Sequence, residues 1–211
     1  MKVVILGAYG QIARLVENRL LSETDTDMIW YLRHASRLTN PDSKRVEIVE
    51  GDVNDTDKLS STLKDADLVY ANLGGAFEPQ AQAVKTAMEL NRVKRLIWVT
   101  GLGLYHELPQ KFEQWNEQSI GHSVMEDTRK AAQILEDSDL DVTIIRAAYM
   151  NNNPEIDYEL TQKGEEFRGT IISRASIADL IVKVIKIPSL YENCSLGIAQ
   201  PNTDDDKPLG Y

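Results

Sequence analysis

Three small residues near the start of the chain have the spacing of a phosphate-binding loop. Gly7, Gly10 and Ala13 follow a short apolar run and open a helix-like pattern. Gly7 permits a tight turn, Gly10 has no Cβ to block a pyrophosphate, and Ala13 allows close packing of helix on strand. Free N–H groups and the helix dipole favour an anion at that helix start. The spacing G-x-x-G-x-x-A departs from the G-x-G-x-x-G fingerprint, and a purely structural turn would also explain it.

The residues after the second apolar run indicate which dinucleotide fits. Sites for NAD usually hold the ribose 2′-hydroxyl with an acidic side chain at this point. No Asp or Glu occurs from Leu32 to Asn40, whereas Arg33 and Arg37 flank Ser36. Guanidinium groups bind phosphate oxygens through a planar fork, so this segment favours NADP over NAD. The alternative is that both arginines are ordinary solvated surface residues.

Six short apolar runs must position these loops. The runs cover residues 3–6, 28–32, 46–49, 67–71, 96–99 and 142–145. They are β-branched or aromatic and too short for buried helices, which predicts strands buried on both faces. Helical periodicity occurs between them, at 12–20, 59–66, 83–90 and 128–136. This alternation at a spacing of roughly 25 residues predicts right-handed βαβ units and a doubly wound parallel α/β sheet.

The alternation loosens after Arg146. Ser176 is expected to cap a helix over 177–187 that Pro188 ends. The segment 147–211 is too short for an independent substrate domain. We therefore expect a single domain over 1–211, in which this last segment completes the sheet edge and covers the cleft as a small cap.

The composition is that of an ordinary globular protein: 211 residues, 42% hydrophobic and 27% charged. No apolar run approaches the about 18 residues that a spanning helix needs, so no membrane partner is expected. The formal net charge of −10 argues against nucleic-acid binding, because an acidic surface repels phosphate backbones.

Further expectations concern the compartment, the assembly and metals. The apolar region and cleavage site of a signal peptide are missing, which predicts a cytoplasmic protein, and we expect a monomer or homodimer. The single cysteine, Cys194, is expected to be an inert packing residue. No His/Cys/Asp cluster has metal-ligand spacing, so no metal is expected.

Five stretches share patterns with a known family. They are 7–13, 51–55, 71–75, 140–146 and 172–179. The last two read L-D-V-T-I-I-R and I-S-R-A-S-I-A-D, similar to the family patterns L-D-Y-T-I-L-R-P and I-S-R-x-D-V-A. Together they resemble the atypical short-chain dehydrogenase/reductase superfamily, in its small NmrA-like branch. The resemblance implies a Rossmann-type sheet with one NAD(P)H along its carboxyl edge.

The resemblance also implies a set of cofactor-binding residues. The phosphate loop would contribute Gly7, Tyr9, Gly10, Gln11 and Ile12. Asp52 and Val53 would hold the adenine, and Asn72, Leu73 and Gly74 would line the ribose and pyrophosphate. Thr100 and Ala147 would line the nicotinamide side. Arg33 and Arg37 complete this set. A turn that caps a strand end would equally explain Asp52, and simple core packing would explain Leu73.

The family's usual proton-transfer residues are missing. Members carry Tyr-x-x-x-Lys, in which the tyrosine donates a proton and the lysine lowers its pKa. If Lys130 is the family lysine, Glu126 stands in place of the tyrosine. Counted back from the following strand, Val124 and Thr128 stand in place of the pair. Members also carry a serine on the fifth strand, and this serine is absent here as well. Thr100 stands in its place and is one candidate catalytic residue.

The loops after the fifth and sixth strands, 101–122 and 147–153, are expected to hold the substrate, because ligands bind beyond the carboxyl ends of such strands. Tyr105, Trp115 and Tyr149 lie in these loops and are expected to face the nicotinamide. Tyr149 is the second candidate catalytic residue. The alternative for Trp115 is that it fills the core under its own loop.

Two classes of function fit these observations. The first is an NAD(P)H-dependent reductase that passes a hydride to a small conjugated acceptor of quinone or flavin type, whose product anion needs little enzymic acid. The second is a non-catalytic NADP(H)-sensing regulatory protein, a kind that NmrA-like proteins are known to include. A nucleotide-sugar epimerase is a distant third.

Overall fold

The computed structural model describes residues 1–38 and 44–210. The large sheet consists of β1 (Lys2–Leu6), β2 (Asp27–Leu32), β3 (Val46–Glu50), β4 (Leu68–Ala71), β5 (Arg95–Gly101), β6 (Asp141–Ala147), β8 (Glu159–Gln162) and β10 (Cys194–Ala199). A second sheet pairs β7 (Tyr149–Asn151) with β9 (Ile171–Ser173). The helices are α1 (Gln11–Glu23), α2 (Thr56–Thr62), α3 (Phe77–Asn91), α4 (Gln110–Ile120), α5 (His122–Glu136) and α6 (Arg174–Lys186), with a 3₁₀ turn at Ala35–Arg37.

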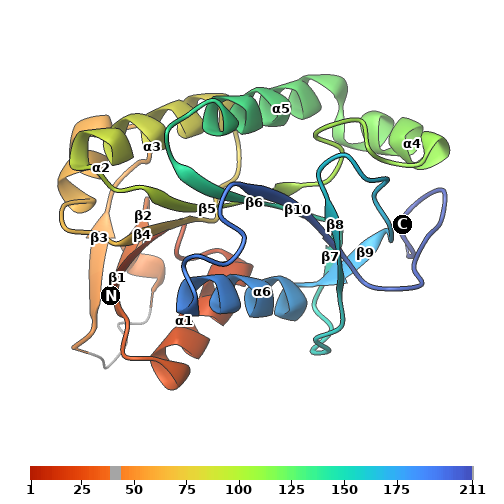
Figure 1. Ribbon diagram of the computed structural model, residues 1–211. Coiled ribbons are helices and arrows are strands. Elements are labelled where there is room, and N and C mark those ends of the chain that lie inside the picture. Colours follow the sequence, from red (N-terminus) through yellow and green to blue (C-terminus); the bar gives the residue numbers. More distant parts are fainter. Residues whose placement is uncertain (39–43, 211) are drawn as a thin grey trace.

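The order of the large sheet is β3-β2-β1-β4-β5-β6-β10-β8, and its first six strands follow the Rossmann order. Neighbouring strands pair in parallel from β3 to β10, and β8 pairs antiparallel to β10. Helices α1 and α6 cover one face of the sheet, and α2, α3 and α5 cover the other (Figure 1). The predicted fold class is confirmed, and each of the six predicted strands is present.

The apolar runs form strands because both of their faces are buried. In β1, Val3 and Ile5 belong to the core on the side of α1 and α6, while Val4 and Leu6 belong to the core under α3 and α5. All four side chains are fully buried. Burial on both faces removes the alternation of polar and apolar residues and leaves a continuous apolar run.

The helices differ from the sequence prediction in three places. The segment 101–122, in which Phe112 and Trp115 were expected to lie on a short helix, contains the eleven-residue helix α4, which begins after Pro109. Helix α5 starts at His122, because Gly121 with a φ of 93° separates it from α4. Helix α6 starts at Arg174, so Ser176 does not cap it. Ser173 is the cap, and its hydroxyl accepts a hydrogen bond from the Ser176 N–H.

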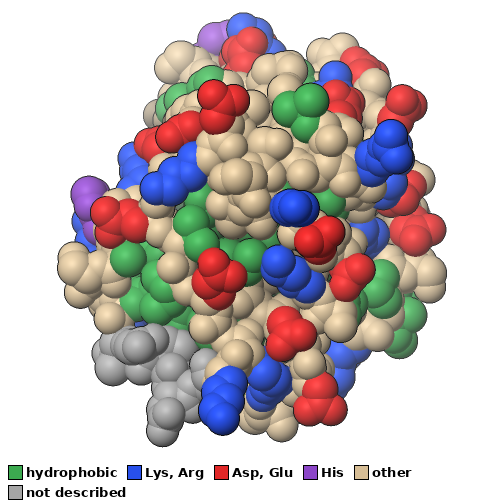
Figure 2. Space-filling model, turned by 90° about the vertical axis from the view of Figure 1, so that its left-hand side faces the viewer, with side chains coloured by type: hydrophobic (Ala, Val, Ile, Leu, Met, Phe, Trp, Pro, Cys, Tyr) green, Lys and Arg blue, Asp and Glu red, His purple; other side chains and the backbone are tan. Residues whose placement is uncertain are grey.

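The segment after residue 147 adds β10 and β8 to the edge of the sheet beside β6. Within the described residues, none of the helices is long and apolar enough to cross a membrane. Acidic and basic side chains are interspersed on the side of the molecule that carries the β3 edge of the sheet (Figure 2).

Candidate functional site

A cleft of about 620 Å³ opens at the carboxyl ends of β1 to β4. Its lining includes ten of the predicted cofactor-binding residues: Gly7, Tyr9, Gly10, Arg33, Arg37, Asp52, Val53, Asn72, Leu73 and Gly74. These residues come from four separate loops of the chain, and the sheet order brings them together. Gln11 and Ile12 do not line the cleft. Gln11 is exposed, whereas Ile12 is buried in the core and can reach a phosphate only through its backbone N–H.

The phosphate loop is closely packed against the end of β4. Gly7 has a φ of 79°, and a Cβ there would collide with the backbone carbonyl of Asn72. A Cβ on Gly10 would collide with the Asn72 side-chain amide. Gly10 also caps α1 without a side-chain hydrogen bond, so the first N–H groups of the helix have no side-chain acceptor from the cap. This backbone cradle at a helix start fits the pyrophosphate of a dinucleotide.

The two predicted arginines stand at the lip of this cleft. Arg33 and Arg37 are both exposed. The Arg37 guanidinium lies over the ring of Tyr9, 5.7 Å from its centroid, and Arg14 lies 5.0 Å from the same centroid. The carboxylate of Glu50, at the end of β3, accepts a hydrogen bond of 2.7 Å from the Ala35 N–H. This contact orders the turn that carries Arg37.

The predicted adenine side of the cleft is formed by a turn at the end of β3. The carboxylate of Asp52 accepts a hydrogen bond from the Asn54 N–H, and the backbone carbonyl of Asp52 accepts one from the Tyr31 hydroxyl. Burial raises the pKa of Tyr31 to about 12, so the hydroxyl keeps its proton and donates it to that carbonyl. Asp52 is therefore a turn residue at a strand end, which was the alternative interpretation of this position in the sequence. It also lines the cleft.

A second cleft, of about 340 Å³, opens where β5 and β6 end. Its lining is mainly apolar and includes Phe77, Met125, Ala147 and Tyr149. The Tyr149 hydroxyl donates to the side-chain oxygen of Asn116 at 2.8 Å. Ala147 lines this cleft, and its place beside the nicotinamide stays a prediction.

Two of the other aromatic and catalytic candidates lie outside this second cleft. Trp115 packs edge-on against Tyr149, with ring centroids 5.2 Å apart, and supports that ring. Thr100 is 5% exposed and lines neither cleft, and its hydroxyl has no hydrogen-bond partner within the described residues. The roles of Thr100 and Tyr149 in catalysis stay predictions.

Helix α5 presents to this cleft one of the two residue pairs that the sequence offers in place of the family's dyad. Val124 and Thr128, one helical turn apart, both line it. The Thr128 hydroxyl donates to the backbone carbonyls of Val124 and Met125. Lys130 points elsewhere, since its Nζ lies 3.5 Å from a carboxylate oxygen of Glu78. These positions agree with the register counted from the following strand.

A buried ion pair holds the loop after β5. The Arg146 guanidinium is fully buried and lies 2.5 Å from Oε1 of Glu107. The Glu107 carboxylate also accepts hydrogen bonds from the N–H groups of Gly103 and Tyr105, at 3.1 and 2.7 Å. A carboxylate with these partners fixes the path of the loop.

The prediction that Tyr105 faces the nicotinamide is wrong. Its hydroxyl lies 2.6 Å from a carboxylate oxygen of Glu136, near the end of α5, and 2.9 Å from the Ser195 hydroxyl. Burial and the nearby Glu136 charge raise the pKa of Tyr105. The Glu107 contact turns the loop so that this ring packs toward β10, away from the apolar cleft.

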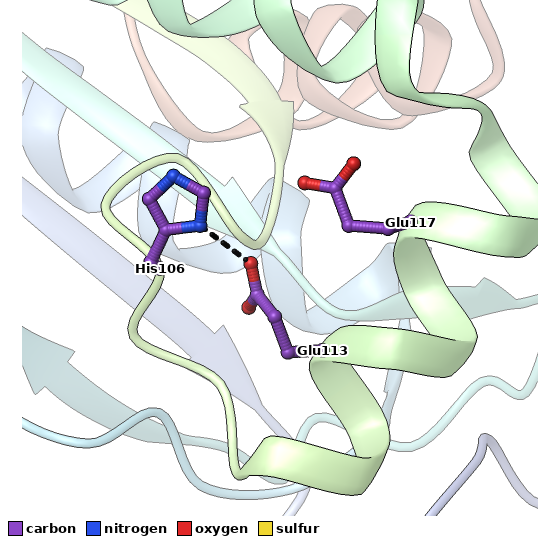
Figure 3. Close-up of side chains that lie close together, drawn as sticks. All are labelled: His106, Glu113 and Glu117. Atoms are coloured by element: carbon purple, nitrogen blue, oxygen red, sulfur yellow. Dashed lines mark hydrogen bonds and ion pairs between the residues drawn. The ribbon is translucent and has the colours of Figure 1, made fainter.

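One group of side chains has the composition of a metal site. His106, Glu113 and Glu117 bring their ligand atoms within 4.8 Å of one another, with His106 directed at Glu113 (Figure 3). However, the Arg129 guanidinium lies among them: it contacts Glu117 and is 3.4 Å from Oε1 of Glu113. Because this cation already neutralises the carboxylates, we interpret the group as an ion-pair network that joins the loop to α4 and α5.

Comparison with known proteins agrees with this geometry. Residues 7–188 match a family model described as NAD(P)H-binding, and the chain belongs to this family. A search of curated protein sequences gave no match. A Rossmann-fold NAD(P)-binding family protein from Shigella flexneri is 38% identical, with a TM-score of 0.85 and coverage of 100% of this chain and 98% of that one.

Two further solved structures are similar. A short-chain dehydrogenase/reductase from Veillonella parvula DSM 2008, in complex with NADP, is 30% identical, with a TM-score of 0.92 and coverage of 99% of this chain and 98% of that one. An anaerobillin reductase from Escherichia coli O157:H7 is 20% identical, with a TM-score of 0.82 and coverage of 97% and 100%. The latter likeness concerns the fold alone.

Proposed function

We propose that this chain is an NADPH-dependent reductase of a small conjugated acceptor, of quinone or flavin type. The observation that carries the proposal is the apolar cleft at the ends of β5 and β6, which shares the carboxyl edge of the sheet with the cofactor cleft. A mainly apolar cavity with a few polar groups suits a flat organic ligand. The E. coli protein named as an anaerobillin reductase shows that the same fold serves a reductase.

The residues of the cleft support hydride transfer without an enzymic acid. A bound nicotinamide cofactor supplies the hydride. The apolar side chains of Leu102, Met125 and Ala148 line the space for the acceptor ring. Thr128 directs its hydroxyl proton to backbone carbonyls, so it is engaged within its own helix. A quinone or flavin tolerates this arrangement, because its reduced anion is delocalised and takes its proton from water at the open side of the cleft.

The proposed preference for NADPH rests on the two arginines that follow β2. Arg33 and Arg37 line the cofactor cleft, and neither forms an ion pair with an acidic residue in the described part of the chain. Both guanidinium groups can therefore receive a 2′-phosphate. The 30% identical Veillonella protein was solved with NADP, which agrees with this preference.

The test is oxidation of NADPH by the purified protein against a panel of quinones, flavins and aldehydes. We expect turnover with quinones or flavins and none with simple aldehydes, whose alkoxide product needs an acid. Val124→Trp should fill the cleft and suppress turnover, because Val124 lines it and is 44% exposed. The matched control is Leu90→Trp on the exposed surface of α3. Tight NADPH binding without turnover of any acceptor would instead favour the sensing role.

A further inference from the structure

The apolar cleft has a single charged residue in its lining. Arg174 stands at its rim, among Phe77, Val124, Met150 and other uncharged residues. It is the first residue of α6, whose cap is Ser173. The start of a helix carries a partial positive charge, so helix and guanidinium add to the same positive field.

Neutral groups hold the Arg174 guanidinium in place. Its Nη1 donates to the side-chain oxygen of Asn152 at 2.9 Å and lies 3.4 Å from the backbone carbonyl of Met150. Both partners belong to the segment at β7 that also forms the cleft wall. These contacts orient the guanidinium without cancelling its charge.

Arg174 has no acidic partner within the described residues, so its charge is available to a ligand. The protein has 33 acidic residues against 23 basic ones. Three arginines, Arg19, Arg129 and Arg146, form ion pairs with carboxylates, whereas Arg33 and Arg37 form none within the described residues. In the described part of the chain Arg174 forms none, although it is half-buried. An oriented guanidinium beside an apolar cavity is suited to a carboxylate, which it can bind through two parallel hydrogen bonds.

We propose that the acceptor is a planar conjugated molecule with a carboxylate, and that Arg174 binds this carboxylate while the rings lie in the apolar cleft. The inference rests on the proposed function, since it names the class of acceptor for the same cleft. Arg174 is thus a specificity-determining residue, and an uncharged quinone of the same shape is the weaker ligand. The cleft volume of about 340 Å³ suits a ligand of two or three fused rings.

The experiment compares two probes of nearly the same shape, of which only the first is charged: anthraquinone-2-carboxylate and anthraquinone-2-carboxamide. Binding of each to the full chain saturated with NADP⁺ is measured by calorimetry, so that the cofactor cleft is filled and no turnover occurs. We expect the carboxylate to bind at least about ten-fold more tightly than the amide. Arg174→Gln should remove this difference by weakening carboxylate binding to about the level of the amide. Arg92→Gln, at the exposed end of α3, is the matched control and should retain the difference.

The outcomes separate this inference from the proposed function. Equal binding of the two probes to the wild-type protein, or binding of neither, overturns the inference, even if neutral quinones are reduced. A preference for the carboxylate that persists in Arg174→Gln overturns it too. A further outcome is that the carboxylate binds in a way that depends on Arg174, while none of the acceptors in the panel supports NADPH oxidation. That result supports the anion site and contradicts the reductase. Arg174→Lys keeps the charge and should retain part of the preference, which provides a second variant if Arg174→Gln does not fold.

Discussion

The guanidinium of Arg37 lies over the ring of Tyr9, 5.7 Å from its centroid, at the lip of the cofactor cleft. Tyr9 belongs to the phosphate loop, whereas Arg37 follows β2, so the contact joins two loops that are distant in sequence. A cation–π contact at an exposed site contributes about 0.5–1 kcal/mol. Tyr9 therefore pre-orders an arginine on which the proposed NADPH preference depends.

The first prediction concerns that preference. A bidentate arginine–phosphate contact contributes on the order of 1.5–3 kcal/mol, so NADPH should bind roughly ten-fold or more tightly than NADH. Arg33→Ala should remove most of the preference and leave NADH binding nearly unchanged. Tyr9→Leu should reduce NADPH affinity by about two- to five-fold through loss of the ring contact. Calorimetric titration with both dinucleotides measures these ratios, and equal affinities in the wild-type protein would contradict the assignment.

The second prediction is that Gly10→Val abolishes cofactor binding in a folded protein. A side chain at Gly10 would displace the Asn72 amide, which lines the same cleft, and would enter the space for the pyrophosphate. We expect NADPH affinity to fall by at least about 100-fold, with a native circular dichroism spectrum. If the variant is folded and still binds NADPH, Gly10 is only a turn residue.

The sequence predicted the parts of this structure that local patterns determine. The runs at 3–6 and 142–145 are strands because burial on both faces leaves a continuous apolar pattern. Helix α4 was not assigned over its full length because few of its residues are buried, with Phe112 and Asn116 as the buried ones. The position of Tyr105 depends on the contact of Glu107 with Arg146, 39 residues away, and no local pattern records such a pair. The absence of an acidic partner for Arg174 is likewise a property of the fold.

The third prediction is that Lys130 is not a catalytic lysine. Its ammonium group is paired with Glu78, its side chain is 58% exposed, and it is absent from the lining of both clefts. Lys130→Ala should change turnover, or NADPH affinity if no turnover is found, by less than about ten-fold, or under ~1.4 kcal/mol. Steady-state kinetics and titration of the variant measure this. A loss of about a thousand-fold would show that Lys130 holds the ribose after all.

The last prediction concerns a buried carboxyl group under the sheet. Glu17 in α1 is 2% exposed, and its Oε1 has no hydrogen-bond partner within the described residues. Burial raises its pKa from 4.5 to about 8, and the charge of Arg14 acts in the opposite direction. Between these two pH values the folded protein binds more protons than the unfolded chain. The contribution of Glu17 to stability therefore decreases as the pH rises from about 4.5 to about 8.

Glu17→Gln tests this linkage, because glutamine has a similar shape and cannot ionise. One pKa unit corresponds to about 1.4 kcal/mol. The free energy of unfolding of the variant should therefore exceed that of the wild type by roughly 3–5 kcal/mol near pH 8, so that the variant is the more stable protein. Near pH 4.5 the two proteins should differ little from this cause, since the carboxyl group is then largely protonated in the fold. Urea unfolding of both proteins across this pH range measures the difference. A gap that does not grow with pH would show that Glu17 keeps an ordinary pKa, with water or a movement of α1 solvating its charge.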